Sequence, residues 1–160
     1  MNAGGGIGAA RLALTGLVRP AEARRRLRNR QYENELFNSR EPERASWALT
    51  DDDARLRVHH YGSPDAPVLV LIHGWSCCIE YWNPQINALA ERYHVIAYDQ
   101  RGGHGESTWG GKRTFDADVL ADDLQAVVDQ SVPDSSKAVF VGHSMGGITV
   151  QAWAHRHRDR

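Results

Sequence analysis

Three short apolar runs without polar interruption stand out along the chain, at residues 68–72, 95–98 and 138–141. A continuous apolar run of this length is typical of a strand that is buried on both faces of a sheet. Between the runs, apolar residues recur at helical spacing. They form one stripe over Trp82, Ile86, Leu89 and Tyr93, and a second over Ala117, Leu120, Leu124, Val127 and Val128. This alternation predicts an α/β fold with a mostly parallel sheet and helices on both faces.

The pattern changes on either side of this core. Residues 46–49 and 56–62 are short extended segments separated by a polar turn, which predicts a hairpin at the start of the sheet. Residues 146–157 predict a helix that begins directly after the last strand. For the helix over residues 117–128, Thr114 is the expected N-cap, with Asp116 and Asp118 in the first turn.

The first part of the chain differs in charge. Residues 1–40 carry eight arginines and three glutamates, net +5, whereas residues 41–160 carry 11 basic and 17 acidic residues, net −6. We predict that residues 1–44 form a basic, flexible or helical arm and that residues 45–160 form the globular domain. The arginine-rich segment 23–30 leaves two interpretations open, a solvated extension and a weak contact with an anionic membrane surface.

Composition narrows the class of protein. The net charge of −1 gives no sign of a nucleic-acid partner. The only cysteines, Cys77 and Cys78, are adjacent and cannot build a disulfide framework, which favours a reducing compartment. No apolar stretch reaches transmembrane length, and the N-terminus is a poor signal peptide. We therefore predict a cytoplasmic protein, and we expect no metal and no cofactor.

The candidate chemistry lies where the last strand meets the last helix, in Gly142-His143-Ser144-Met145-Gly146. A serine hydroxyl needs exposure, a base and donors for the developing oxyanion. A sharp strand-to-helix turn exposes Ser144 and leaves the main-chain N–H of Met145 free to stabilise negative charge. Strand and helix come so close in such a turn that the flanking positions must be tiny, which explains Gly142 and Gly146.

The strand at residues 68–72 ends in His73-Gly74-Trp75. Gly74 would let the main chain bend over the site and place the N–H of Trp75 as a second oxyanion donor. His73 is interpreted as a brace for this loop rather than a base or metal ligand. Cys77 and Cys78 follow, but no base for a thiol nucleophile is evident, so they are interpreted as small packing residues.

Three segments carry a family resemblance: "LIHGW", "AYDQRGGHGES" and "VGHSMGG", in this order. Together they resemble the α/β-hydrolase superfamily, in its serine esterase and lipase-like branch. The resemblance implies an eight-stranded, mostly parallel sheet, of which about five strands can be counted here. It also implies Ser144 as the nucleophile, with the N–H groups of Trp75 and Met145 as the oxyanion hole. The loop from Asp99 to Ser107 has one residue more than the family pattern, at Gly102 or Gly103.

The resemblance also implies an acid and then a histidine after the serine, on loops of later strands. His155, His157 and Asp159 follow Ser144 too far along the predicted helix to reach its hydroxyl. A dyad of Ser144 with His104 is geometrically conceivable. We hypothesise that the chain is the N-terminal portion of a longer hydrolase, truncated after the nucleophile helix, with little activity alone. A non-catalytic module that keeps the fold is the alternative.

The expected substrate is a small carboxylic ester, hydrolysed through an acyl-enzyme. Amide, thioester, carbon–carbon and peracid chemistry remain open. Relatives with a nucleophilic aspartate, such as dehalogenases and epoxide hydrolases, are disfavoured because Ser144 occupies that position. In the resembling fold the strand at residues 138–141 lies between two neighbours. One is missing here, so self-association through this edge is expected.

Overall fold

The computed structural model describes residues 28, 37–102, 105–111, 116–133 and 137–158. The chain divides into two compact units, Met1–Asn38 and Ser39–Arg160. The described residues of the second unit form nine elements: β1 (Arg44–Leu49), β2 (Arg55–Tyr61), β3 (Val68–Ile72), the 3₁₀ helix η1 (Ile79–Trp82), α3 (Asn83–Leu89), β4 (His94–Tyr98), α4 (Ala117–Ser131), β5 (Ala138–Gly142) and α5 (Met145–Arg156).

The five strands form one mixed sheet in the order β1-β2-β4-β3-β5. The predicted hairpin is present: β1 pairs antiparallel with β2, and β2 pairs antiparallel with β4. The three predicted parallel strands are also present, because β3 pairs parallel with β4 on one side and with β5 on the other. The carboxyl ends of these three strands therefore meet at one edge of the sheet, where ligand sites of α/β folds lie. Burial on both faces is found for β3 and β4, but this prediction was wrong for β5, where Val139 and Val141 are exposed.

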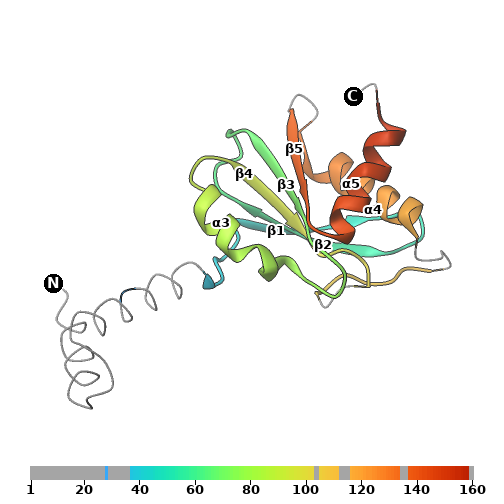
Figure 1. The fold of residues 1–160 in the computed structure, drawn as a ribbon, viewed down its shortest axis with the longest axis horizontal. Helices are drawn as coiled ribbons and strands as arrows, with labels where there is room; N and C mark the ends of the chain where they lie inside the picture. The colour runs from blue at the N-terminus through green and yellow to red at the C-terminus, as the bar shows by residue number, and fades with distance from the viewer. Residues whose placement is uncertain (1–27, 29–36, 103–104, 112–115, 134–136, 159–160) are drawn as a thin grey trace, which may run out of the picture. The chain divides into compact units, whose positions relative to one another are not determined.

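Helices cover both faces of the sheet, α4 and α5 on one side and α3 on the other (Figure 1). In β3, Val68, Val70 and Ile72 belong to the core under α4 and α5, whereas Leu69 and Leu71 belong to the core under η1 and α3. Successive side chains of a strand point to opposite faces, and here both faces are buried. This is why the sequence of β3 is continuously apolar instead of alternating.

Two predicted helix boundaries were wrong. The stripe from Trp82 to Tyr93 is not one helix: a 3₁₀ turn ends at Trp82, α3 follows with Pro84 in its first turn, and it stops at Leu89. Proline is well placed there because its missing N–H would have no helical acceptor. The N-cap of α4 is Asp116, whose carboxylate accepts a hydrogen bond from the N–H of Val119 at 2.9 Å.

The N-cap predicted for α4, Thr114, lies outside the described residues. Asp118 is in the first turn of α4, as expected. None of the helices within the described residues is both long enough and apolar enough to span a membrane.

Candidate active site

Ser144 lies at the junction of β5 and α5, in a conformation that few non-glycine residues adopt. Its φ is 53° and its ψ is −117°, and its side chain is exposed. The turn is closed by a hydrogen bond from the N–H of Gly146 to the carbonyl of His143, at 2.8 Å. Backbone strain of this kind costs about 1–3 kcal/mol and is typical of functional sites. Here the strained residue is also exposed to solvent.

The two glycines that flank this turn are required by close main-chain contacts. A Cβ built on Gly142 would lie 2.3 Å from the carbonyl oxygen of Gly146. A Cβ on Gly146 would lie 2.2 Å from the carbonyl oxygen of Ile72 and 2.6 Å from that of His73. The first turn of α5 thus rests directly on the ends of β5 and β3, with no room for a side chain between them.

The loop after β3 lies against the same junction. A Cβ on Gly74 would be 3.0 Å from Nδ1 of His143 and 3.3 Å from Cβ of Ser144, and His143 donates its N–H to the carbonyl of Ile72 at 3.0 Å. Trp75 follows Gly74 immediately and is 54% exposed. Met145 is the first residue of α5, so its N–H has no acceptor within the helix.

His73 is fully buried, and both of its ring nitrogens bond to main-chain groups. Nδ1 contacts the carbonyl of Gly74 at 2.7 Å, and Nε2 accepts the N–H of Gln100 at 2.9 Å. The proton therefore sits on Nδ1, and burial lowers the pKa of this imidazole, which keeps it neutral. These bonds join the loop after β3 to the loop after β4 and leave neither nitrogen free for a base or a metal.

Asp99, at the end of β4, joins three segments, and the sequence analysis assigned it no role. Its carboxylate accepts the N–H of Ile79 and the N–H of Glu106, each at 2.8 Å, and its carbonyl accepts the hydroxyl of Ser107 at 2.6 Å. A Cβ on Gly105 would lie 1.9 Å from the carboxyl carbon of Asp99. Gly105 thus makes room for the carboxylate of Asp99.

Gln100 connects the loop after β3 to α5. Its amide nitrogen donates to the carbonyl of His73, and its amide oxygen accepts the hydroxyl of Thr149 at 2.8 Å. Both Gln100 and Thr149 are buried. No motif or periodicity predicts this contact. The signal that could have found it is the run of three polar residues directly after a buried strand, Asp99, Gln100 and Arg101.

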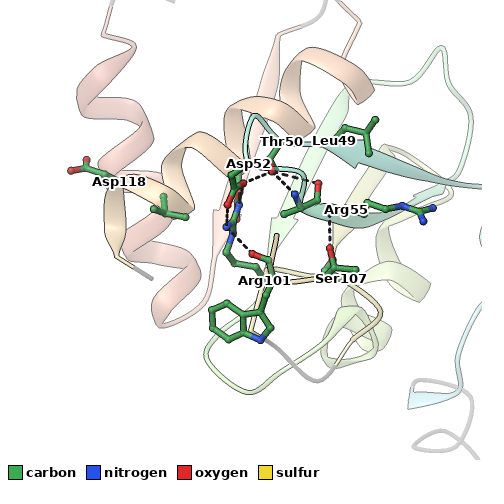
Figure 2. A network of polar contacts seen from close by, with 12 residues as sticks. Leu49, Thr50, Asp52, Arg55, Arg101, Ser107 and Asp118 are labelled. Atoms are coloured by element: carbon green, nitrogen blue, oxygen red, sulfur yellow. Dashed lines mark hydrogen bonds and ion pairs between the residues drawn. The ribbon is translucent and has the colours of Figure 1, made fainter. Parts of the chain in front are cut away.

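Arg101 lies within a buried network of charges (Figure 2). Its guanidinium binds both carboxylate oxygens of Asp123 on α4 and both of Asp52 in the β1–β2 turn, and also the carbonyl of Trp109. Burial alone would lower the pKa of Arg101, but these two carboxylates raise it above its ordinary value. The network fixes the hairpin to α4, with no direct contact to Ser144 among the bonds of the described residues.

Cys77 and Cys78 are free thiols and partly buried. Burial, together with a hydrogen bond to Glu80, raises the pKa of Cys78 to about 11. A thiol with so high a pKa is a poor nucleophile near neutral pH, because the thiolate is the reactive form.

The candidate bases do not reach the nucleophile in the described part of the chain. His104 and Asp159 lie outside the described residues. His155 contacts Arg158 at 2.6 Å, and the ring of His157 packs on Trp153, both at the far end of α5. Among the described residues, no imidazole is hydrogen-bonded to the hydroxyl of Ser144.

Comparison with known proteins shows the family of this chain. The profile of the alpha/beta hydrolase fold matches residues 67–160, more than half of the chain. The chain belongs to the α/β-hydrolase family. An epoxide hydrolase A of Mycobacterium tuberculosis is 40% identical over 107 residues, which are 66% of this chain and 33% of the relative. A bifunctional esterase/perhydrolase of Acinetobacter calcoaceticus is 38% identical over 114 residues, which are 69% of this chain and 39% of the relative.

Solved structures agree with the family assignment. A Rhodococcus esterase matches with a TM-score of 0.62 and 29% identity, over 71% of this chain and 41% of the esterase. The chain therefore spans between a third and a half of the length of these relatives. The predicted superfamily and fold class are confirmed, as is a hydrolase relationship.

Proposed function

We propose that the protein is a serine hydrolase that cleaves carboxylic esters through an acyl-enzyme on Ser144. The observation that carries the proposal is the strained, exposed Ser144 at the N-terminus of α5, with the loop of Gly74 and Trp75 packed against it. The esterase and the bifunctional esterase/perhydrolase among the relatives support ester chemistry.

The arrangement suits each step of ester cleavage. The oxygen of Ser144 attacks the ester carbonyl, and its proton passes to an imidazole outside the described residues. The negative charge that develops on the carbonyl oxygen is stabilised by the N–H groups of Met145 and Trp75. Because α5 begins at Met145, its dipole adds to this stabilisation. The alcohol then leaves, and water hydrolyses the acyl-enzyme to the acid.

Epoxide opening, the activity in the name of the 40% identical relative, fits Ser144 less well. A carboxylate that opens an epoxide forms an ester, whose carbonyl water can then attack. A serine alkoxide that opens an epoxide forms an ether, which has no carbonyl and cannot be released in the same way. The chemistry of residue 144 therefore favours an acyl-transfer reaction over epoxide hydrolysis.

An alkyl fluorophosphonate tests the proposal without requiring turnover. We expect it to label the full-length protein at Ser144 and to give no labelling in Ser144→Ala. Ser76→Ala is the matched control, because Ser76 is also exposed and also has a positive φ, 56°. It should be labelled like the unaltered protein. Modification mapped to Cys77, or labelling that persists in Ser144→Ala, would refute the assignment. A complete lack of labelling would favour a non-catalytic module.

A further inference from the structure

Three aromatic rings lead from the core to the nucleophile. Trp82, at the end of η1, is 7% exposed and belongs to the core between α3 and the sheet. Tyr81 meets it edge-on, with ring centroids 5.7 Å apart and an interplanar angle of 82°. On its other side Tyr81 stacks on His143, with centroids 4.8 Å apart and an angle of 28°. Its hydroxyl also lies 3.3 Å from Nε2 of His143.

The same imidazole approaches the main chain of the loop after β3. Nδ1 of His143 would be 3.0 Å from a Cβ on Gly74, so a side chain at residue 74 would crowd this ring and shift it by a few tenths of an ångström. His143 therefore contacts Tyr81 with one side and lies against Gly74 with another. Its own main chain carries Ser144, the next residue.

Burial does not account for Tyr81, because its side chain is 47% exposed. What distinguishes it is position. The proposed oxyanion donors are the N–H groups of Trp75 and Met145. Trp75 directly follows Gly74, against which the His143 ring lies, and Met145 directly follows Ser144, the residue after His143. Anything that holds His143 against Gly74 also holds these two donors at a fixed separation.

We propose that Tyr81 is a positioning residue, which acts through His143 to fix the loop of Gly74 and Trp75 relative to Ser144 and Met145. The catalytic part of this inference rests on the proposed function of Ser144, whereas the contact itself can be tested without any reaction. A misplacement of about 1 Å at a reacting group can cost about 100-fold in rate.

The stacked contact matters more than the hydrogen bond. The bond is 3.3 Å long and both side chains are exposed, so water can replace it at little cost. Tyr81→Phe keeps the stack and loses the bond, whereas Tyr81→Leu loses both. His143→Phe keeps a ring beside Tyr81 and is the reciprocal variant. Trp109→Leu is the control, because Trp109 is another exposed aromatic residue, at 54%, on the loop after β4.

Hydrogen exchange tests the contact first. In Tyr81→Leu we expect faster amide exchange at Gly74–Ser76 and at Met145, with unchanged exchange in the helix α4. Tyr81→Phe, His143→Phe and Trp109→Leu should exchange at the same sites like the unaltered protein. Unchanged exchange at Gly74–Ser76 in Tyr81→Leu would overturn the proposal, whether or not Ser144 reacts.

Labelling kinetics then test the positioning role. For an alkyl fluorophosphonate, we expect Tyr81→Leu to lower the maximal labelling rate about 10-fold, with the half-saturating probe concentration within about twofold of that of the unaltered protein. Tyr81→Phe should be labelled at the same maximal rate as the unaltered protein. An equal loss in Tyr81→Phe, or a loss only in probe affinity, would refute positioning through the stack. If the unaltered protein is not labelled, the proposed function fails, and hydrogen exchange still decides the contact.

Discussion

Because Gly146 has no side chain, α5 can begin directly on the end of β3. The variant Gly146→Ala tests how far the stability of the fold and the reactivity of Ser144 depend on this close contact. A Cβ there would lie 2.2 Å from the carbonyl oxygen of Ile72 and 2.6 Å from that of His73. Both oxygens are main-chain atoms at a buried strand end, so neither can move aside as a flexible side chain can. Ordinary contact requires the start of α5 to move by roughly 1 Å.

Gly147→Ala is the matched control, one residue further along the same helix. A Cβ on Gly147 meets nothing closer than the carbonyl oxygen of Gly142, at 3.5 Å. Alanine is favoured over glycine within a helix by about 0.5–1 kcal/mol, so this variant should be more stable by up to that amount. The same gain is available to Gly146→Ala, but overpacking costs about 1–3 kcal/mol or more. The two variants should therefore change stability in opposite directions.

Urea unfolding followed by tryptophan fluorescence gives the difference in stability, and fluorophosphonate labelling gives its effect on the nucleophile. We expect Gly146→Ala to unfold at lower urea and to react up to about 100-fold more slowly at Ser144. Gly147→Ala should unfold at equal or higher urea and react normally. If Gly146→Ala proved as stable and as reactive as Gly147→Ala, the contact with Ile72 would not be what requires glycine.

Further expectations concern parts of the fold outside the nucleophile turn. Arg101→Met should lower the free energy of unfolding by about 3–5 kcal/mol, because it leaves buried carboxylates unpaired, and a loss below about 1 kcal/mol would contradict this. Burial lowers the pKa of His60 to about 4 and also lowers that of His94. Since unfolding returns the pKa of His60 to its ordinary value of about 6.5, the free energy of unfolding should fall by about 2 kcal/mol between pH 7 and pH 5. This fall should be smaller in His60→Leu. The edge of β5 carries exposed Val139 and Val141, so the chain should self-associate in size-exclusion chromatography and Val139→Lys should weaken this; a monomer at every concentration would refute it.

The strands were predictable because their surroundings are uniform. Every residue of β3 and of β4 is buried. A strand that is covered by a layer of helices on both faces favours apolar residues at successive positions, so it can be recognised as a continuous apolar run. The helices were predictable in position but not in extent. The stripe of Trp82, Ile86, Leu89 and Tyr93 kept its period beyond Leu89, where α3 stops, because Tyr93 packs on the same core from the connection that follows.

The site was predictable only where it is local. The turn around Ser144 could be predicted from five consecutive residues. The contacts of Asp99 with Ile79, of Gln100 with Thr149 and of Tyr81 with His143 join residues 20, 49 and 62 positions apart. No period or motif connects such pairs, and several other side chains could make similar contacts. The sequence alone could not show which partner each polar residue finds.

Glycine is the exception, because a contact made by the main chain leaves only one choice of residue. Gly142 and Gly146 each mark a place where two segments touch without a side chain between them, whereas the neighbour of Gly74 is the side chain of His143. Two of these contacts join segments about 70 positions apart, at Ile72 and Gly146 and at Gly74 and His143. A long-range contact between two main-chain segments therefore leaves a sign in the sequence, because it requires glycine. A long-range contact made by a side chain leaves no such sign, because several residue types could make it. The nucleophile turn is held by main-chain contacts that require glycine, whereas the position of the proposed oxyanion loop depends on main-chain contacts and on side-chain contacts.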